Sequence, residues 1–215
     1  MNQIISAYCI IKPYQIRVNG RIEFHDENFI TFAEFIKSVY KKETVSYPKF
    51  YKMDALSKLG FLSAELILKQ INLDLYHREK IGVVLANAAS SLDTDLAYQQ
   101  SINDRSNYFP SPSVFVYTLP NIMIGEICIR HQLKGENAFL IGEKFNSRIL
   151  FNYVFELFQH NRVEACLTGW VDLMKDGFNS LLMFIEPAEK AITAGKTWKV
   201  LPFSAENMDA LYNIT

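Results

Sequence analysis

Apolar residues recur along this chain in two patterns, which predict strands alternating with helices. Short continuous apolar runs at 3–11 and 81–86 are typical of strands that are buried on both faces of a sheet. Between these runs, apolar residues at three- and four-residue steps predict a helix over 53–71 with one buried face. Because strands alternate with helices, we expect a mixed or parallel sheet that is covered by helices.

The rest of the chain continues this alternation, with capping and turn residues between the elements. Ser90 and Ser91 can cap a helix over 92–102, and the polar, proline-containing segment 103–112 predicts a loop. An apolar helix is expected from Pro120 to about residue 133, with Gly135 after its end. Strands are expected at 137–142, 163–170, 181–185 and 198–203, helices at 146–160 and 205–212, and a polar segment at 187–196.

The size and composition of the chain predict one globular domain over residues 1–215. The chain has 215 residues, of which 49% are apolar, and a formal net charge of -1. This apolar content suits a substantial core, and no proline- or glycine-rich linker divides the chain. A near-neutral charge argues against binding through overall positive charge, so no nucleic-acid partner is expected.

Cysteine and histidine residues give no sign of a metal or redox centre. The cysteines Cys9, Cys128 and Cys166 follow no zinc or redox spacing, and three is an awkward number for a disulfide framework. We therefore expect a reducing, cytoplasmic location, no metal and no cofactor. The apolar start of the chain reaches Lys12 and Pro13 too soon for a signal peptide or a membrane span.

Three segments, in this order, carry motifs of one enzyme family. Residues 52–60 (KMDALSKLG) are similar to a helix opening R-M-D-x-x-x-x-x-A, and residues 81–86 (IGVVLA) to the strand that follows it. Residues 120–130 (PNIMIGEICIR) are similar to a helix P-N-x-x-x-G-x-I-A-I. Together they resemble the N-terminal half of the β-ketoacyl-(acyl carrier protein) synthases, the condensing enzymes of the thiolase superfamily.

This resemblance implies an α/β fold. We expect a thiolase-like half-domain with a mixed, mostly parallel sheet of about five strands covered by helices. The core spans about 1–186, and 187–215 form a C-terminal extension. The full family has two similar halves, and the second half supplies a lysine and two histidines in His-Gly-Thr and Gly-His-x-x-Gly contexts. None of the histidines of this chain stands in such a context: His25, His77, His131 and His160.

The resemblance also locates the family's nucleophile. In the family, a strand that opens with a Gly-Pro-Asn-like turn ends at the catalytic cysteine, nine residues after the glycine. Nine residues after Gly135, this chain has Lys144. The register continues without a gap to Gly169, where the family has a paired glycine turn and this chain has Trp170 as the second residue.

A lysine at this position cannot do the chemistry of the cysteine. Claisen condensation needs a thiolate that holds the acyl chain as a thioester, whereas an amine would form a stable amide. The following helix start disfavours a buried ammonium, so we expect Lys144 to face solvent, pair with Glu143 or lose its proton. Lys144, with its neighbours Glu143 and Asn146, is either a charge that blocks an acyl site or an unconstrained residue of a retired one.

A mixture of cations and aromatic residues lies between residues 37 and 52. It includes Lys41, Lys42, Lys49 and Lys52. Such a mixture could dock an acidic acyl carrier protein, the usual partner of condensing enzymes. It could also bind single-stranded nucleic acid, or be the solvated end of a helix and a loop.

Three functions stay open from the sequence. The first is a non-catalytic ketosynthase-like subunit in fatty-acid, polyketide or aryl-polyene-type assembly, comparable to the family's chain-length-factor subunits, which lack the cysteine. The second is a 3-oxoacyl-(acyl carrier protein) synthase-type acyltransferase with an atypical or partner-supplied active site. The third is a non-enzymatic protein that binds an acyl chain or a small ligand in an apolar pocket beside the 146–160 helix.

Two surfaces follow from the resemblance. In the family, the strand before the nucleophile pairs with its copy across a two-fold axis, so 137–142 is the expected edge of a homodimer or of a heterodimer with a ketosynthase. Pairing would also protect an exposed strand edge. The 146–160 helix is apolar around much of its circumference, and we expect the segment after residue 187 to cover part of it.

Overall fold

The computed structural model describes residues 2–29, 31–104, 106, 108–175, 177–193 and 198–214. The strands are β1 (Gln3–Lys12), β2 (Gln15–Val18), β3 (Arg21–His25), β4 (Ile81–Asn87), β5 (Asn137–Ile141), β6 (Ala165–Met174), β7 (Gly177–Pro187) and β8 (Leu201–Pro202). The α-helices are α1 (Phe32–Lys42), α2 (Ala55–Leu68), α3 (Leu92–Ile102), α4 (Pro112–Phe115), α5 (Ile122–His131), α6 (Ser147–Gln159), α7 (Ala188–Thr193) and α8 (Ala205–Tyr212). Short 3-10 helices are η1 (Pro48–Lys52), η2 (Leu73–Leu75), η3 (Arg78–Lys80) and η5 (Val116–Thr118).

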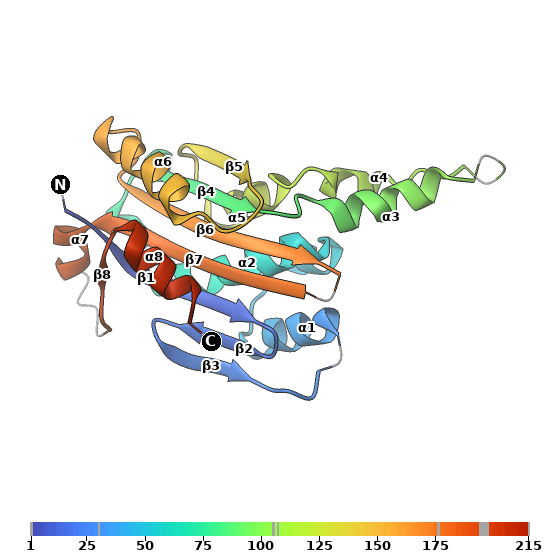
Figure 1. The fold of residues 1–215 in the computed structure, drawn as a ribbon, viewed down its shortest axis with the longest axis horizontal. Helices are drawn as coiled ribbons and strands as arrows, with labels where there is room; N and C mark the ends of the chain where they lie inside the picture. Colours follow the sequence, from blue (N-terminus) through green and yellow to red (C-terminus); the bar gives the residue numbers. More distant parts are fainter. Residues whose placement is uncertain are drawn as a thin grey trace.

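The described strands form one mixed sheet in the order β3-β2-β1-β7-β6-β4-β5, with β8 beside β1 (Figure 1). Strand β4 pairs in parallel with β5 and β6, while β7 runs antiparallel between β6 and β1. Among the five strands β1, β7, β6, β4 and β5, only β7 therefore points the other way. This core confirms the expected mixed, mostly parallel sheet, and the β2–β3 hairpin and β8 extend it to eight strands.

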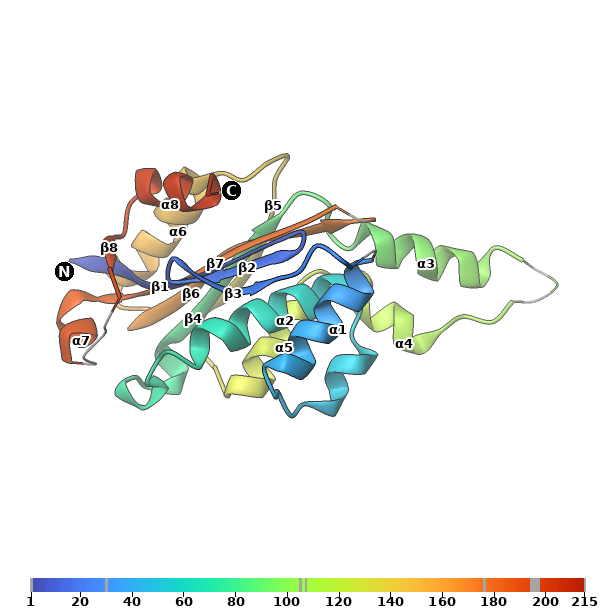
Figure 2. The same cartoon turned by 90° about the horizontal axis from the view of Figure 1, so that it is seen from below.

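Both faces of the central sheet are buried. Helices α1, α2 and α5 cover one face, and α6 and α8 cover the other (Figure 2). Every residue of β4 is buried. Val83 and Leu85 belong to the core on the α2 face, and Val84 and Ala86 to the core on the α6 face. This division follows from the period of two along a strand, and it explains the continuous apolar run.

The segment after β7 covers part of α6, as the sequence predicted. Strand β8 pairs with β1, and the Trp198 indole donates to the carbonyl oxygen of Ser6 at 2.7 Å. The α6 core includes buried Phe203, Met208 and Leu211 from this segment. Part of α6 stays uncovered, because Ile149 and Tyr153 are exposed.

Several elements differ from the sequence prediction. The β2–β3 hairpin and helices α1 and α7 were not predicted, and residues 194–196 of the expected polar segment lie outside the described residues. Strands β6 and β7 are longer than predicted because they continue as an antiparallel hairpin, and the expected strand at 198–203 is reduced to β8. Helix α1 has a capping box, in which Thr31 and Glu34 exchange hydrogen bonds with each other's backbone N–H.

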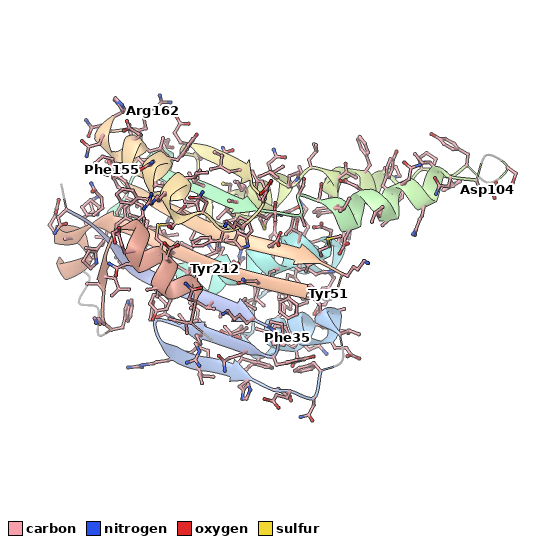
Figure 3. All side chains as sticks on the ribbon, in the orientation of Figure 1. Phe35, Tyr51, Asp104, Phe155, Arg162 and Tyr212 are labelled. Atoms are coloured by element: carbon pink, nitrogen blue, oxygen red, sulfur yellow. The ribbon has the colours of Figure 1, made fainter. Side chains whose placement is uncertain are left out.

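Helices α3 and α4 form an arm that projects beyond the sheet, with Asp104 near its tip (Figures 1 and 3). Neither helix has a buried residue. The two helices contact each other, and the rings of Tyr98 and Phe115 lie 5.2 Å apart.

The base of the arm is also hydrogen-bonded to the rest of the chain. The Thr94 hydroxyl donates to Asp54 at 2.8 Å, and Asp93 accepts from the Lys175 N–H at 2.5 Å. The arm exposes apolar side chains, among them Leu96 and Phe109.

We expect Gly169→Ala to lower the free energy of unfolding by about 2–3 kcal/mol or more. Gly169 has φ +153°, and an added Cβ would lie 2.0 Å from the Leu181 carbonyl oxygen across the β6–β7 pair. The matched control is Gly125→Ala inside α5, where an added Cβ meets no atom within 4 Å. This control should raise the free energy by about 0.5–1 kcal/mol. Chemical denaturation measures both, and equal midpoints for the two variants would contradict the packing described.

Candidate functional site

Lys144, the position that the sequence resemblance assigns to a nucleophile, lies where parallel strands end. The C-terminal ends of the parallel strands β4, β5 and β6 lie at the same end of the sheet. The turn from β5 to α6, at this end, carries Glu143 and Lys144. Both side chains are exposed. Lys144 thus faces solvent, which is the first of the three outcomes expected for a cation beside a helix start. Asn146 caps α6, because its side-chain oxygen accepts from the Ile149 N–H at 3.2 Å.

A small hollow lies beside Lys144. Its lining includes Ala86, Ile141, Ile149 and Trp170, and its volume is about 40 Å³. An apolar cavity of about 150 Å³ is needed to hold benzene, and ligand pockets usually span about 300 Å³ or more. The hollow is therefore too small for an acyl chain in this conformation.

An aromatic row fills the space next to this hollow. The row consists of Trp170 from β6, Phe145 from the turn and Tyr212 from α8 (labelled in Figure 3). Trp170 is 3% exposed, and its ring meets Phe145 edge-on with centroids 6.0 Å apart. Phe145 stacks on Tyr212 at 4.2 Å. The C-terminal helix therefore holds the turn that carries Lys144.

Side chains engage backbone N–H groups in the turn after β4. The Asp172 carboxylate accepts from the N–H groups of Ala88 at 3.0 Å and Ala89 at 2.9 Å. The side chain of Asn87 both donates to the carbonyl oxygen of Ser90 and accepts from its N–H. An oxyanion hole needs free donors aimed at the developing charge. In this turn the N–H groups of Ala88, Ala89 and Ser90 are already engaged.

The histidines also lie away from Lys144. Each forms an ion-pair contact with a glutamate: His25 with Glu27, His77 with Glu164, His131 with Glu65 and His160 with Glu156. None of them lines the hollow. The described residues therefore place no imidazole where it could assist decarboxylation or bind an oxyanion.

The three cysteines of this chain lie away from Lys144, and burial disfavours the thiolate form of each. Cys9 and Cys166 are fully buried, and burial raises the pKa of both thiols well above its usual range. Burial also raises the pKa of Cys128 to about 11. The thiolate is the reactive form, so all three are inert near neutral pH. They are free cysteines on β1, α5 and β6, as the sequence predicted.

The four lysines considered for carrier docking belong to α1 and η1. Figure 2 shows α1 on the opposite face of the sheet from α6, the helix that follows Lys144. Lys42 donates to the carbonyl oxygen of Glu23 and lies 5.2 Å above the Phe24 ring. Lys49 pairs with the buried carboxylate of Glu126 at 2.8 Å. These two lysines therefore have contacts within the chain, while Lys41 and Lys52 are exposed.

The described residues contain no group of three or more His, Cys, Asp or Glu side chains placed to hold a metal ion. No single described helix is long and apolar enough to cross a membrane. One pair, Pro112–Thr118 with Ile122–His131, reaches the required length and composition only together and is bent by 96°.

Sequence reasoning found Lys144 and Trp170 but not the residues that hold them. Phe145 and Tyr212 are far apart in the sequence and meet only through the fold. The role of Asp172 had no local signal, because its partners lie at the end of β4. Asn146 had a detectable signal, since an asparagine before an apolar helix is a typical cap.

No protein-family model and no curated protein sequence matches this chain. Solved structures do match. The ishigamide ketosynthase/chain length factor has a TM-score of 0.67 and 18% identity, over 88% of this chain and 63% of that chain. A type II polyketide ketosynthase in complex with its acyl-carrier protein (AntDE:AntF) has a TM-score of 0.63 and 12% identity, over 90% and 65%. The ketosynthase ApeO with its chain length factor ApeC, from Xenorhabdus doucetiae, gives 0.59 and 10%, over 87% and 80%.

These likenesses define the class of fold. The chain has the thiolase-like α/β fold that ketosynthases and chain length factors share, which confirms the fold implied by the sequence motifs. At 10–18% identity the comparison establishes the fold alone. The chain spans less than two thirds of the length of the first two of these structures.

We expect Lys144→Cys to introduce one cysteine that reacts rapidly with iodoacetamide. The new thiol would be exposed and close to the N-terminus of α6, which lowers a thiol pKa. The three native cysteines should react at least about tenfold more slowly in the folded protein, since their pKa values are raised by burial. Intact mass over time measures the reaction, with unfolded protein as the control. A slow reaction at position 144 would show that this turn is buried.

Proposed function

We propose that this chain is a non-catalytic ketosynthase-like subunit, comparable to a chain length factor, in fatty-acid, polyketide or aryl-polyene-type acyl chain assembly. The observation that carries the proposal is the small hollow of about 40 Å³, lined by buried Trp170, beside Lys144, the position that the sequence resemblance assigns to the nucleophile. Two further features support the proposal: backbone N–H groups of the turn after β4 are engaged within the chain, and none of the described histidines lines the hollow beside Lys144. A chain that has no thiolate, no imidazole and no space for an acyl chain at this site would act by binding a catalytic subunit.

The proposed partner surface is the outer edge of β5. This strand ends the sheet among the described strands, so its outward N–H and C=O groups are open to pairing. Ile141 on β5 is 61% exposed and Ile149 on α6 is 55% exposed, and both line the same hollow. Ile129 on neighbouring α5 is also exposed. An open edge flanked by apolar side chains suits a second thiolase-like subunit.

The comparisons support this choice of partner. Two of the similar structures combine a ketosynthase with a chain length factor, and one contains an acyl-carrier protein. We therefore propose a heterodimer with a ketosynthase, with a homodimer of this chain as the alternative arrangement. An acidic carrier protein would dock weakly on Lys41 and Lys52, which are exposed near α1 and η1.

We expect Ile141→Lys to weaken the complex with a ketosynthase from the same organism by about tenfold or more, because it buries a charge at the pairing edge. The matched control is Ile22→Lys. Ile22 is 52% exposed on β3, at the opposite edge of the same sheet. Co-expression with a tagged ketosynthase and light scattering measure the complex. Light scattering on this chain alone distinguishes a homodimer.

Two results would contradict the partner role. One is a wild-type chain that stays monomeric and retains neither ketosynthase nor carrier protein. The other is an equal effect of Ile141→Lys and Ile22→Lys, which would remove β5 as the interface.

We also expect no covalent acyl adduct on this chain. Each thiol is protonated near neutral pH, and the amine of Lys144 lies outside any pocket that could hold an acyl chain. Incubation with acyl thioesters followed by intact mass measurement tests this. A stoichiometric adduct at one residue would support the acyltransferase alternative instead.

A further inference from the structure

A larger pocket lies on the opposite face of the sheet from Lys144. It is formed between α1, η1 and α2 and has a volume of about 190 Å³. Its lining is mainly apolar: Phe32, Ala33, Ile36, Phe50, Tyr51 and Ala55. Tyr51 is labelled on this side of the molecule in Figure 3. The pocket coincides with part of the mixed basic and aromatic segment found in the sequence.

The volume of this pocket matches a small ring. An apolar cavity of about 150 Å³ holds benzene, so 190 Å³ accommodates one aromatic ring with a short substituent. It is below the range of about 300–1,000 Å³ that is typical for drug-sized ligands. The occupant must therefore be small.

Aromatic residues form fixed walls. Phe50 is fully buried and stacks on Tyr40 with ring centroids 4.0 Å apart. Tyr51 meets Phe50 edge-on at 5.9 Å and is itself 52% exposed. A planar ligand could contact these rings by stacking or edge-on packing, without a change in the packed core.

The charged residues that line the pocket are both cations, Lys37 on α1 and Lys58 on α2. Neither has an ion pair within 4.0 Å among the described residues. Burial lowers the pKa of Lys58, and the nearby carboxylate of Asp54 acts in the other direction. Asp54 caps α2 and accepts from the Thr94 hydroxyl at 2.8 Å, and it does not line the pocket. The described residues that line the pocket therefore contain two ammonium groups and no carboxylate, which favours an anion in the pocket.

We propose that this pocket binds a small aromatic monocarboxylate. Its ring lies against Phe50 and Tyr51, and its carboxylate meets Lys58 and Lys37. The site is independent of the proposed β5 interface, because it lies between α1, η1 and α2. Figure 2 shows α1 and α2 on the opposite face of the sheet from α6. The site also differs from the acyl site of the condensing-enzyme fold, and from the apolar pocket expected beside α6.

Titration of the full chain with benzoate and cinnamate tests this proposal. Calorimetry should give a Kd on the order of 1 mM, the strength expected of a ligand of this size. Benzyl alcohol, which has the ring without the charge, should bind about tenfold more weakly or worse. Amide NMR shifts on adding benzoate should concentrate in α1, η1 and the start of α2.

Variants separate the ring contact from the charge contact. Lys58→Met and Lys37→Met should each raise the Kd for benzoate by about threefold to tenfold or more and leave benzyl alcohol unchanged. The control Lys41→Met is on the same helix but does not line the pocket. Ala33→Phe, at an exposed position on the pocket wall, should fill the pocket and abolish binding of both ligands. Its control is Ala210→Phe, an exposed position on α8.

Three outcomes would overturn the proposal. These are an absence of benzoate and cinnamate binding, NMR shifts that concentrate outside the pocket, and equal benzoate affinity in the wild type, Lys58→Met and Lys37→Met. If Lys58→Met fails to fold, Lys37→Met and Ala33→Phe still decide the question, because both positions are exposed. None of these outcomes bears on the β5 interface.

Discussion

The burial of both faces of the central sheet is the constraint on which the rest of the structure depends. Strands β4, β6 and β7 are apolar on both sides, so an uncovered face would expose a large hydrophobic surface. Helices α2 and α5 meet this requirement on one face. On the other face α6 does so only together with α8 and β8. The C-terminal segment is therefore part of the core, and Lys12 of β1 holds its end through the carbonyl oxygen of Ile214.

The position of α8 also accounts for the small size of the hollow beside Lys144. Because α8 lies across the α6 face, Tyr212 reaches Phe145, and Phe145 in turn packs on Trp170. The side chain at position 144 is exposed, at the rim of a hollow of about 40 Å³. A cysteine at this position would add a thiol without adding space for an acyl chain, because the hollow would keep its aromatic wall.

The sequence predicted what depends on local pattern. The spacing of apolar residues predicted β1, α2, β4 and the alternating helices and strands after them. Counting nine residues from Gly135, as the family motif does, singled out Lys144. Helix α1 was missed because only its C-terminal part, from Lys37, was considered, as part of a mixed basic and aromatic patch. Its apolar residues at helical spacing lie mostly before that patch: Phe32, Phe35, Ile36 and Val39. The β2–β3 hairpin is short and partly polar, which leaves little signal. The Phe145–Tyr212 contact and the role of Asp172 depend on residues far apart in the chain, so no window of sequence contains them.

The two edges of the sheet are built differently, and this asymmetry favours a partner at one of them. On β3, Arg21, Glu23 and His25 alternate along the strand, and charged side chains at an edge oppose pairing with another strand. On β5 the sequence Asn-Ala-Phe-Leu-Ile contains no charged residue. A chain selected only to stay monomeric would protect both edges. Both edges carry an exposed isoleucine, Ile22 on β3 and Ile141 on β5, so the difference between them lies in the charged residues of β3. An edge without charged residues is the one that the proposed second subunit would pair with.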